Sequence, residues 1–204
     1  MKKILLSAAA IFAFGFVSAQ ETRFGAKAGL NLANLGGDIE DAEMLLGFHV
    51  GGFAEVMISD KFGVQPELLF SMQGAKSESS EDIGGTEFTY ESKLKLAYLN
   101  IPIMAKYYAT EDFNLQFGPQ IGFLMSAKDE YEVSGGGDSE SESEDVKDAF
   151  ESIDFGVNFG LGYNFGENFG VEARYNLGLS NIIKDADDFS VNNSVIQVSF
   201  GYKF

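Results

Sequence analysis

Apolar and polar residues alternate along most of this chain. In residues 153–165, seven apolar side chains alternate with polar residues and glycines without an exception. A period of two is typical of a β-strand whose two faces meet different surroundings. The pattern predicts eight strands, at residues 23–35, 47–58, 62–74, 93–108, 113–125, 153–165, 169–179 and 195–204. Within the fourth, the apolar phase changes near Tyr98 and Leu99, and a β-bulge there would absorb the change.

The connections between these strands alternate between two lengths. The tight turns are residues 59–61, 110–112 and 166–168, and the long polar connections are residues 36–46, 76–87, 128–151 and 181–193. Short connections at one rim and long ones at the other are typical of an up-and-down transmembrane barrel. We therefore predict an all-β fold, an eight-stranded antiparallel up-and-down transmembrane β-barrel with short periplasmic turns and long extracellular loops.

Side-chain size separates this fold from a soluble β-barrel such as a lipocalin-like carrier. One strand face carries Phe, Tyr, Leu and Ile, and the other is rich in Gly, Asn and Gln. An eight-stranded barrel encloses little more than its own side chains, so about 40 large apolar groups cannot fit inside it. Glycine in a strand costs backbone entropy, and a water-facing surface does not require such small residues. We therefore expect the bulky face to contact lipid.

Charged residues on the opposite face then project into the lumen. The candidates are Lys27, Glu55, Glu67, Lys106, Glu172 and Arg174, three of each sign. Buried charges are tolerated when they are paired and hydrogen-bonded. We predict a charge network that plugs the lumen, with a gated ion path as the alternative.

The first residues have the pattern of an export signal. Two lysines precede an apolar run from Ile4 to Val17, and small residues follow up to Ala19. About 14 apolar residues is short against the roughly 20 that a spanning helix needs. We predict a cleaved signal peptide at residues 1–19, an outer-membrane barrel domain at residues 20–204, and a location in the cell outer membrane.

Composition excludes several classes of protein. The chain of 204 residues has no cysteine, so disulfides do not stabilise it, and its net charge of −17 argues against nucleic-acid binding. The four long connections, the second counted to residue 91, hold 22 acidic and 4 basic residues. EVSGGGDSESESEDVKD in the third has the composition of a solvated mobile loop. A divalent-cation site is the alternative, although the spacing matches no EF-hand-like loop.

Aromatic residues gather beside the tight turns, as in the girdles that flank the lipid belt of outer-membrane barrels. We expect the periplasmic girdle to include Phe62, Tyr107, Tyr108, Phe113, Phe165, Phe169, Tyr202 and Phe204.

Six segments in this order resemble a known family. They are GFHVGGFAEV, VQPELLFSMQGAK, LAYLNIPIMAKYY, GPQIGFLMS, VEARYNLGLSNI and the terminal SFGYKF. Over about residues 22–204 the chain resembles the small outer-membrane β-barrel domain family, often labelled porin family, which is similar in architecture to OmpA- and OmpX-type barrels. The resemblance implies insertion by the outer-membrane assembly machinery, with Phe204, Tyr202 and Phe200 as the recognition signal. It does not imply transport.

Some barrels of similar architecture act on lipid A through a histidine, a serine and an acid. The single histidine, His49, lies on the inner face of its strand, where Ser71 or Ser126 could approach. No pattern brings a base and a nucleophile within hydrogen-bond reach, so we predict no catalytic residue.

These observations together predict a non-enzymatic, monomeric outer-membrane barrel. It would serve envelope structure or surface interaction through its acidic extracellular loops. Its partners would be outer-membrane lipid, the assembly machinery, and an extracellular partner or divalent cations, with no cofactor and no nucleic acid. A narrow passive channel for ions or small solutes is the alternative, and a lipid A-modifying enzyme is less favoured.

Overall fold

The computed structural model describes residues 22–39, 42–135, 138–186 and 189–204. Within these ranges the chain forms nine strands and one short 3-10 helix. The elements are β1 (Thr22–Gly37), β2 (Glu43–Ser59), β3 (Phe62–Ile83), β4 (Thr86–Tyr108), β5 (Phe113–Gly135), β6 (Asp138–Asp145), η1 (Lys147–Ala149), β7 (Ile153–Phe165), β8 (Phe169–Gly178) and β9 (Val191–Lys203). The predicted signal peptide lies outside the described residues.

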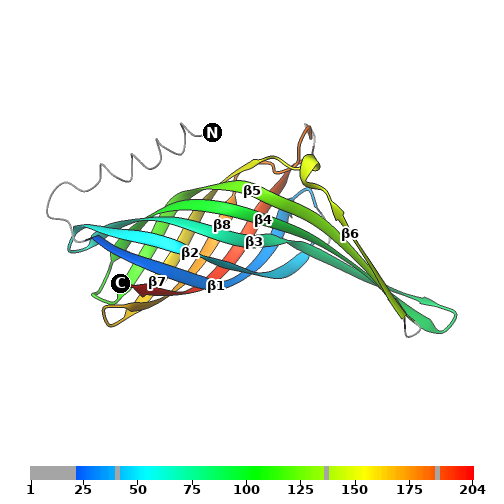
Figure 1. Cartoon of the computed structure of the whole chain (residues 1–204), viewed down its shortest axis with the longest axis horizontal. Coiled ribbons are helices and arrows are strands. Elements are labelled where there is room, and N and C mark those ends of the chain that lie inside the picture. Colours follow the sequence, from blue (N-terminus) through cyan, green and yellow to red (C-terminus); the bar gives the residue numbers. More distant parts are fainter. Residues whose placement is uncertain (1–21, 40–41, 136–137, 187–188) are drawn as a thin grey trace.

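Eight of the strands close into a ring. Its order is β1-β2-β3-β4-β5-β7-β8-β9, every neighbouring pair is antiparallel, and β9 pairs back with β1 (Figure 1). The predicted eight-stranded barrel is thus confirmed. In the part of the chain that the structure describes, no helix is both long and apolar enough to cross a bilayer.

The two rims of the barrel differ as predicted. Residues 60–61, 109–112 and 166–168 make the short turns at the periplasmic rim, where the first and last strands also meet. There the Phe204 backbone N–H donates to the Phe24 carbonyl at 2.8 Å. The opposite, extracellular rim carries the longer connections and extended hairpins (Figure 1).

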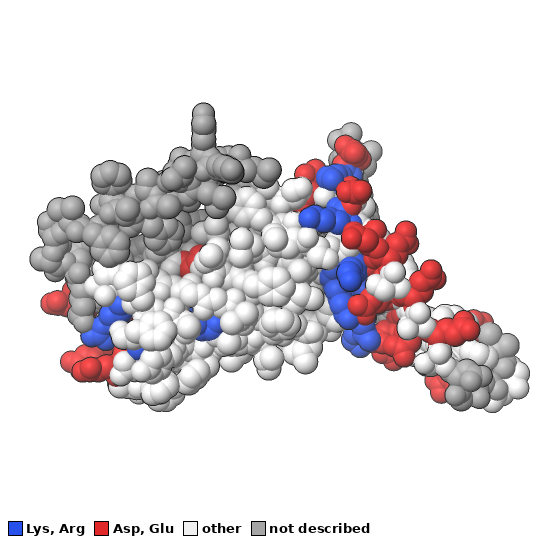
Figure 2. Space-filling model, in the orientation of Figure 1, with Lys and Arg blue, Asp and Glu red and all other residues white. Residues whose placement is uncertain are grey.

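Large apolar side chains cover the outside of the barrel. Phe155, Phe159 and Leu161 are each about half exposed, and so are many other residues of the same strand face. Figure 2 shows this surface as an uncharged belt between charged residues at the two ends. The lumen holds polar side chains such as Asn31, Gln65 and Asn158, all of them buried.

Three barrel strands continue beyond the extracellular rim, and β6 joins them there in one antiparallel sheet. β3 and β4 are joined only by Gly84 and Gly85, whose φ angles of +68° and +86° suit a two-residue hairpin turn. β5 continues to Gly135, and β6 pairs antiparallel with its outer part. We call residues 77–92 and 129–145 the projection, which extends away from the barrel in Figure 1.

The expectation of loops was therefore wrong over residues 76–83, 86–87, 128–135 and 138–145, which lie in strands, whereas residues 146–151 do connect two strands. The Ser- and Glu-rich composition matches a disordered segment, but residues 139–144 also alternate Ser with Glu, a period of two. β4 pairs with β5 as far as Phe88, opposite Gly135. This neighbour supplies backbone hydrogen bonds that composition alone does not reveal.

The predicted bulge is also placed differently. β4 keeps one phase, with Leu96, Tyr98 and Asn100 all buried on the lumen side. The irregularity lies in its pairing with β5, where Ala97 faces Ser126 and Tyr98 faces Leu124, so that Met125 is the extra residue. The sequence pattern suggests a change of phase because, near the outer rim, the side chains of β4 that point inward are apolar rather than polar.

Those inward apolar side chains belong to a cluster that fills the extracellular mouth of the barrel. Its buried members are Leu35, Ala75, Leu96, Tyr98, Leu124, Ala127, Phe150, Ile182 and Val191. Backbone hydrogen bonds from Ile182 to Val191 at 2.9 Å and from Glu151 to Ile182 at 2.8 Å hold the connecting segments over the mouth. We call this group the apolar cap.

Candidate functional site

The lumen of the periplasmic half contains a compact set of ion pairs. Lys27 Nζ lies 3.1 Å from Glu67 Oε1 and 2.5 Å from Glu172 Oε2. Arg174 Nη1 and Nη2 donate to the two oxygens of Glu67 at 2.9 and 2.6 Å, and Nη2 also reaches Glu172 at 2.9 Å. Such a bidentate pair fixes both the geometry and the register of its partners. Four of the six predicted lumen residues thus meet at one point.

Glu55 is the centre of a second group nearer the periplasmic rim. It accepts from Lys106 at 2.9 Å and from Lys203 at 2.6 Å, and the Tyr108 hydroxyl also donates to it. Lys106 lies 3.4 Å from Glu172, which links the two groups. Tyr108 is therefore a lumen residue, and its assignment to the lipid-facing girdle was wrong because its strand position points inward.

Two lumen charges were missed by the sequence reasoning, namely Lys203 and Asp154. Asp154 accepts hydrogen bonds from Ser180 at 2.7 Å and from Asn193 at 2.8 Å. Both residues lie on the polar phase of their strands, so the alternation could have revealed them. With the six predicted residues they make four charges of each sign.

Little space remains around Lys27 and Glu172, whereas a wider opening of about 250 Å³ at the periplasmic rim is lined by Glu55, Tyr108 and Lys203. A cavity of about 20 Å³ lies among Lys27, Phe53, Gln65, Glu172 and Lys203. A volume of that size holds about one water molecule. The long side chains fit because glycines face them. A Cβ atom added to Gly160 would lie 2.7 Å from Arg174 Cγ, closer than a real contact allows.

His49 lies farther out in the lumen, within a neutral hydrogen-bond network. Its Nε2 lies 2.7 Å from Ser199 Oγ, and its Nδ1 lies 2.8 Å from Asn31 Oδ1. Ser71 accepts from the Asn31 amide at 3.0 Å. The serine that hydrogen-bonds to the imidazole is therefore Ser199; of the two suggested serines, Ser71 lies directly opposite His49 in the register but its hydroxyl accepts from Asn31 instead. Both His49 and Ser199 are buried, with exposures of 1% and 4%.

The girdle and terminal residues lie at the periplasmic rim of the outer surface. Phe62 contacts Tyr107 and Phe169 contacts Tyr202, each with ring centroids 5.0 Å apart. Phe165 stacks edge-on against Tyr163 at 5.0 Å. Phe200, Phe204, Phe165 and Phe62 are all more than half exposed, while Phe113 is half-buried.

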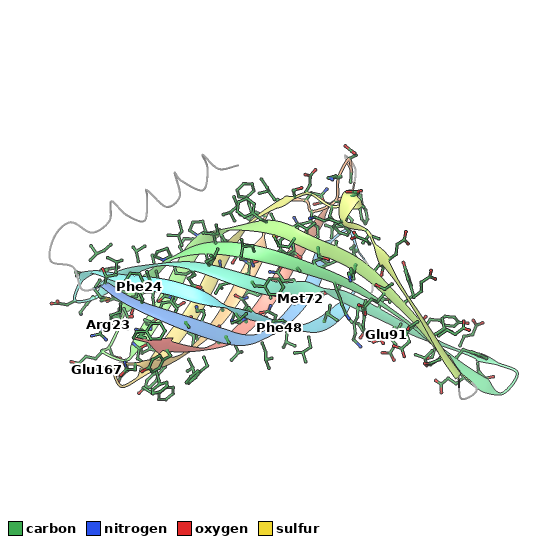
Figure 3. The ribbon with its side chains drawn as sticks, viewed as in Figure 1. Arg23, Phe24, Phe48, Met72, Glu91 and Glu167 are labelled. Atoms are coloured by element: carbon green, nitrogen blue, oxygen red, sulfur yellow. The ribbon has the colours of Figure 1, made fainter. Side chains whose placement is uncertain are left out.

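The projection has a very different charge pattern. It contains 13 acidic and no basic residues. Glu91 faces Glu78 on one neighbouring strand and Glu132 on the other. Figure 3 places Glu91 beyond the wall residues Phe48 and Met72. In the described part of the chain, no three acidic or histidine side chains gather closely enough to hold a metal ion.

Lysines mark the root of the projection. Lys93 donates to Glu91 at 2.5 Å, and this hydrogen bond raises the pKa of the Lys93 ammonium. Lys76 lies 3.1 Å from Glu43, whose hydrogen bond likewise raises the Lys76 pKa. Lys95 pairs with Glu130 at 2.6 Å. Lys93 and Lys76 thus remain cationic over the physiological pH range.

Solved structures with a similar chain path include several bacterial barrels. The attachment invasion locus protein Ail of Yersinia pestis is 16% identical, with 90% of this chain and 99% of that chain covered and a TM-score of 0.46. Neisserial surface protein A is 16% identical, with coverage of 89% and 97% and a TM-score of 0.44. The N-terminal β-barrel domain of Pseudomonas aeruginosa OprF is 13% identical, with coverage of 91% and 100% and a TM-score of 0.37.

No curated protein sequence matches the chain. A family model does, over residues 18–184, and its description is outer membrane protein beta-barrel domain. Since this match spans most of the chain, the protein belongs to the outer membrane protein beta-barrel domain family and is an outer-membrane β-barrel protein.

Proposed function

We propose that this protein is a monomeric, non-enzymatic barrel that presents an acidic sheet at the cell surface for interaction with external molecules. The observation that carries this proposal is the continuity of β3, β4 and β5 from the lipid belt into the projection. The projection places 13 carboxylates on a hydrogen-bonded framework rather than on a loose loop. Such a framework favours recognition because little conformational entropy is lost on binding.

Two features support a lumen that does not conduct. The ion pairs around Glu67 and Glu55 occupy the periplasmic half, and the apolar cap occupies the extracellular mouth. An ion that crossed would have to separate several buried pairs, and an unpaired buried charge costs several kcal/mol, about 3–5. The barrel then acts as an anchor for the projection.

The environment of His49 supports the absence of enzymatic activity. Its imidazole and the Ser199 hydroxyl are both buried among neighbouring lumen side chains. A nucleophile that no substrate reaches has no catalytic use. Their hydrogen bonds instead satisfy polar groups within the network.

Planar-bilayer recording tests the closed lumen. We expect no resolved single-channel steps from the wild-type protein. Resolved steps that disappear in Arg174→Gln would instead establish the narrow-channel alternative, because Arg174 lies at the centre of the ion pairs.

Removal of the projection tests the surface role. Residues 77–92 and 129–145 are each replaced by a two-residue turn, and binding of a labelled oligolysine peptide is measured on whole cells. We expect binding to fall at least tenfold while gel heat-modifiability, the sign of a folded barrel, persists. Equal binding by the shortened barrel would contradict the proposal.

We further propose that export uses cleavage after Ala19 and that the assembly machinery recognises Phe200, Tyr202 and Phe204. These three side chains share the exposed outer face of β9 and its end. Phe204→Ala should lower the assembled fraction in membranes, measured by heat-modifiability after a pulse of synthesis. An unchanged fraction would remove the terminal residue from the signal.

A further inference from the structure

The outward faces of β3, β4 and β5 share one order of residue types. Each begins with apolar side chains, continues with lysine and ends with glutamate. The order is Phe70, Met72, Lys76, Glu78 on β3; Ile101, Leu99, Lys95, Lys93, Glu91 on β4; and Phe123, Met125, Lys128, Glu130 on β5. Figure 2 shows the result as a band of basic residues between the uncharged belt and the acidic projection. We call Lys76, Lys93, Lys95 and Lys128 the lysine row.

The register brings these lysines together across the strands. Lys76 lies directly opposite Lys93, and Lys95 lies directly opposite Lys128. Like charges in directly opposed positions of an antiparallel sheet destabilise it. An anion placed between them would remove that repulsion.

The bulge at Met125 is what brings Lys128 into the row. Before the bulge, even-numbered residues of β5, such as Gln116 and Gln120, are buried in the lumen. After it, Ala127 is buried and Lys128 is exposed. The single extra residue therefore turns Lys128 outward, beside Lys95.

The lysines differ in how their charge is already satisfied. Lys76, Lys93 and Lys95 each contact a carboxylate, whereas the Lys128 ammonium has no hydrogen bond or ion pair with any residue that the structure describes. Asp145 faces Lys128 in the register, but its carboxylate accepts the Lys147 backbone N–H at 3.0 Å. The Lys147 ammonium donates to the Met125 carbonyl at 2.9 Å, so a further cation lies beside the bulge.

The position of the lysine row relative to the membrane indicates which ligand it binds. Met125, 53% exposed, is the last apolar residue of the outward face of β5 before Lys128. The row therefore lies where the hydrocarbon ends and the headgroups begin. Phosphate groups are the main anions at that level, and lysine binds them as a point charge. We propose that the lysine row binds the phosphate groups of lipid headgroups in the outer leaflet.

Titration with lipid A tests this proposal on the folded, full-length barrel. Native mass spectrometry in detergent gives the apparent Kd for bisphosphorylated lipid A. Because a lysine near an anionic surface contributes about fivefold in affinity, we expect Lys128→Gln to weaken binding about fivefold. The Lys95→Gln/Lys128→Gln double variant should lose roughly tenfold or more. Gel heat-modifiability shows that every variant is folded.

Lys61→Gln is the matched control, since Lys61 is an exposed lysine at the periplasmic rim. It should leave the Kd unchanged. If Lys61→Gln lowered the affinity for lipid A as much as Lys128→Gln does, the proposal would be overturned, because lipid A would then be attracted to any lysine of the surface. Equal affinity for dephosphorylated lipid A would exclude phosphate as the ligand. Displacement of lipid A by equimolar inorganic phosphate would instead assign the row to a soluble anion and overturn the lipid assignment.

Discussion

The lumen and the projection arrange their charges in opposite ways. In the lumen, Glu67 contacts Lys27 and Arg174, and charges of opposite sign balance. In the projection, Glu91 lies between Glu78 and Glu132, and the lysine that it contacts, Lys93, belongs to the root. A buried charge without a partner is costly, whereas water and salt screen exposed charges of one sign. Charge pairing therefore distinguishes the part of the sheet that is buried from the part that is presented to solvent.

Removal of a lumen carboxylate should have the largest effect on the free energy of unfolding. Glu67→Leu leaves Lys27 and Arg174 with fewer partners in a buried site, so we expect a loss of about 4 kcal/mol in unfolding free energy. The measurement is urea unfolding in liposomes, followed by heat-modifiability. Glu140→Gln, which removes one exposed charge from the projection, should change stability by less than about 0.5 kcal/mol. The Glu67→Leu/Arg174→Leu double variant should recover part of the loss, and equal losses for Glu67→Leu and Glu140→Gln would contradict the comparison.

Shortening a side chain of the apolar cap should cause the second-largest loss of stability. Phe150 is 6% exposed, and its replacement by alanine leaves a cavity worth about 3 kcal/mol. Because the cap lies between the lumen and the projection, hydrogen exchange should accelerate at the Glu151 and Ile182 amides. Unchanged protection there would mean that the cap does not hold the extracellular segments.

A substitution in the hairpin turn of the projection should cause a smaller loss of stability. Gly84→Ala places a side chain at φ +68°, a strain of about 1 kcal/mol. We expect faster hydrogen exchange in the outer parts of β3 and β4 and no change in the barrel. Gly36→Ala is the control, since a Cβ atom there meets nothing within 4 Å. Slower exchange or barrel unfolding in Gly84→Ala would argue against an independent projection.

Relief of repulsion in the projection should give the smallest effect. Glu132→Gln removes one of two directly opposed carboxylates, so it should stabilise the outer sheet by a few tenths, roughly 0.3 kcal/mol, at low salt. The gain should vanish near 1 M salt. Glu142→Gln, opposite Tyr131, serves as the control. A gain that persists at high salt would point to a cause other than charge.

The strands of the barrel wall were predictable because their period of two is a local property. The outward position of residues such as Phe155 and Phe159 followed from side-chain volume, since an eight-stranded lumen is too small to hold them. Parity alone also places Tyr108 and Lys203 inward, so a stricter use of the alternation would have found both.

The extracellular half was harder to predict for physical reasons. Residues 139–144 have the composition of a disordered segment, and only the partner strand β5 shows that they pair. The apolar cap breaks the rule that apolar side chains face lipid, and Leu96 obscured the phase of its strand. Cross-strand partners such as Lys95 and Lys128 depend on the register, which one residue at Met125 changes.

The length of the central strands has a mechanical consequence. β4 and β5 each contain 23 residues. At about 3.3 Å per residue such a strand spans roughly 75 Å, whereas crossing a bilayer takes only about 10 residues. About half of each strand therefore lies outside the hydrocarbon as a rigid extension of the barrel wall. A force on its tip is carried into the membrane-embedded wall through the backbone hydrogen bonds that join β3, β4 and β5.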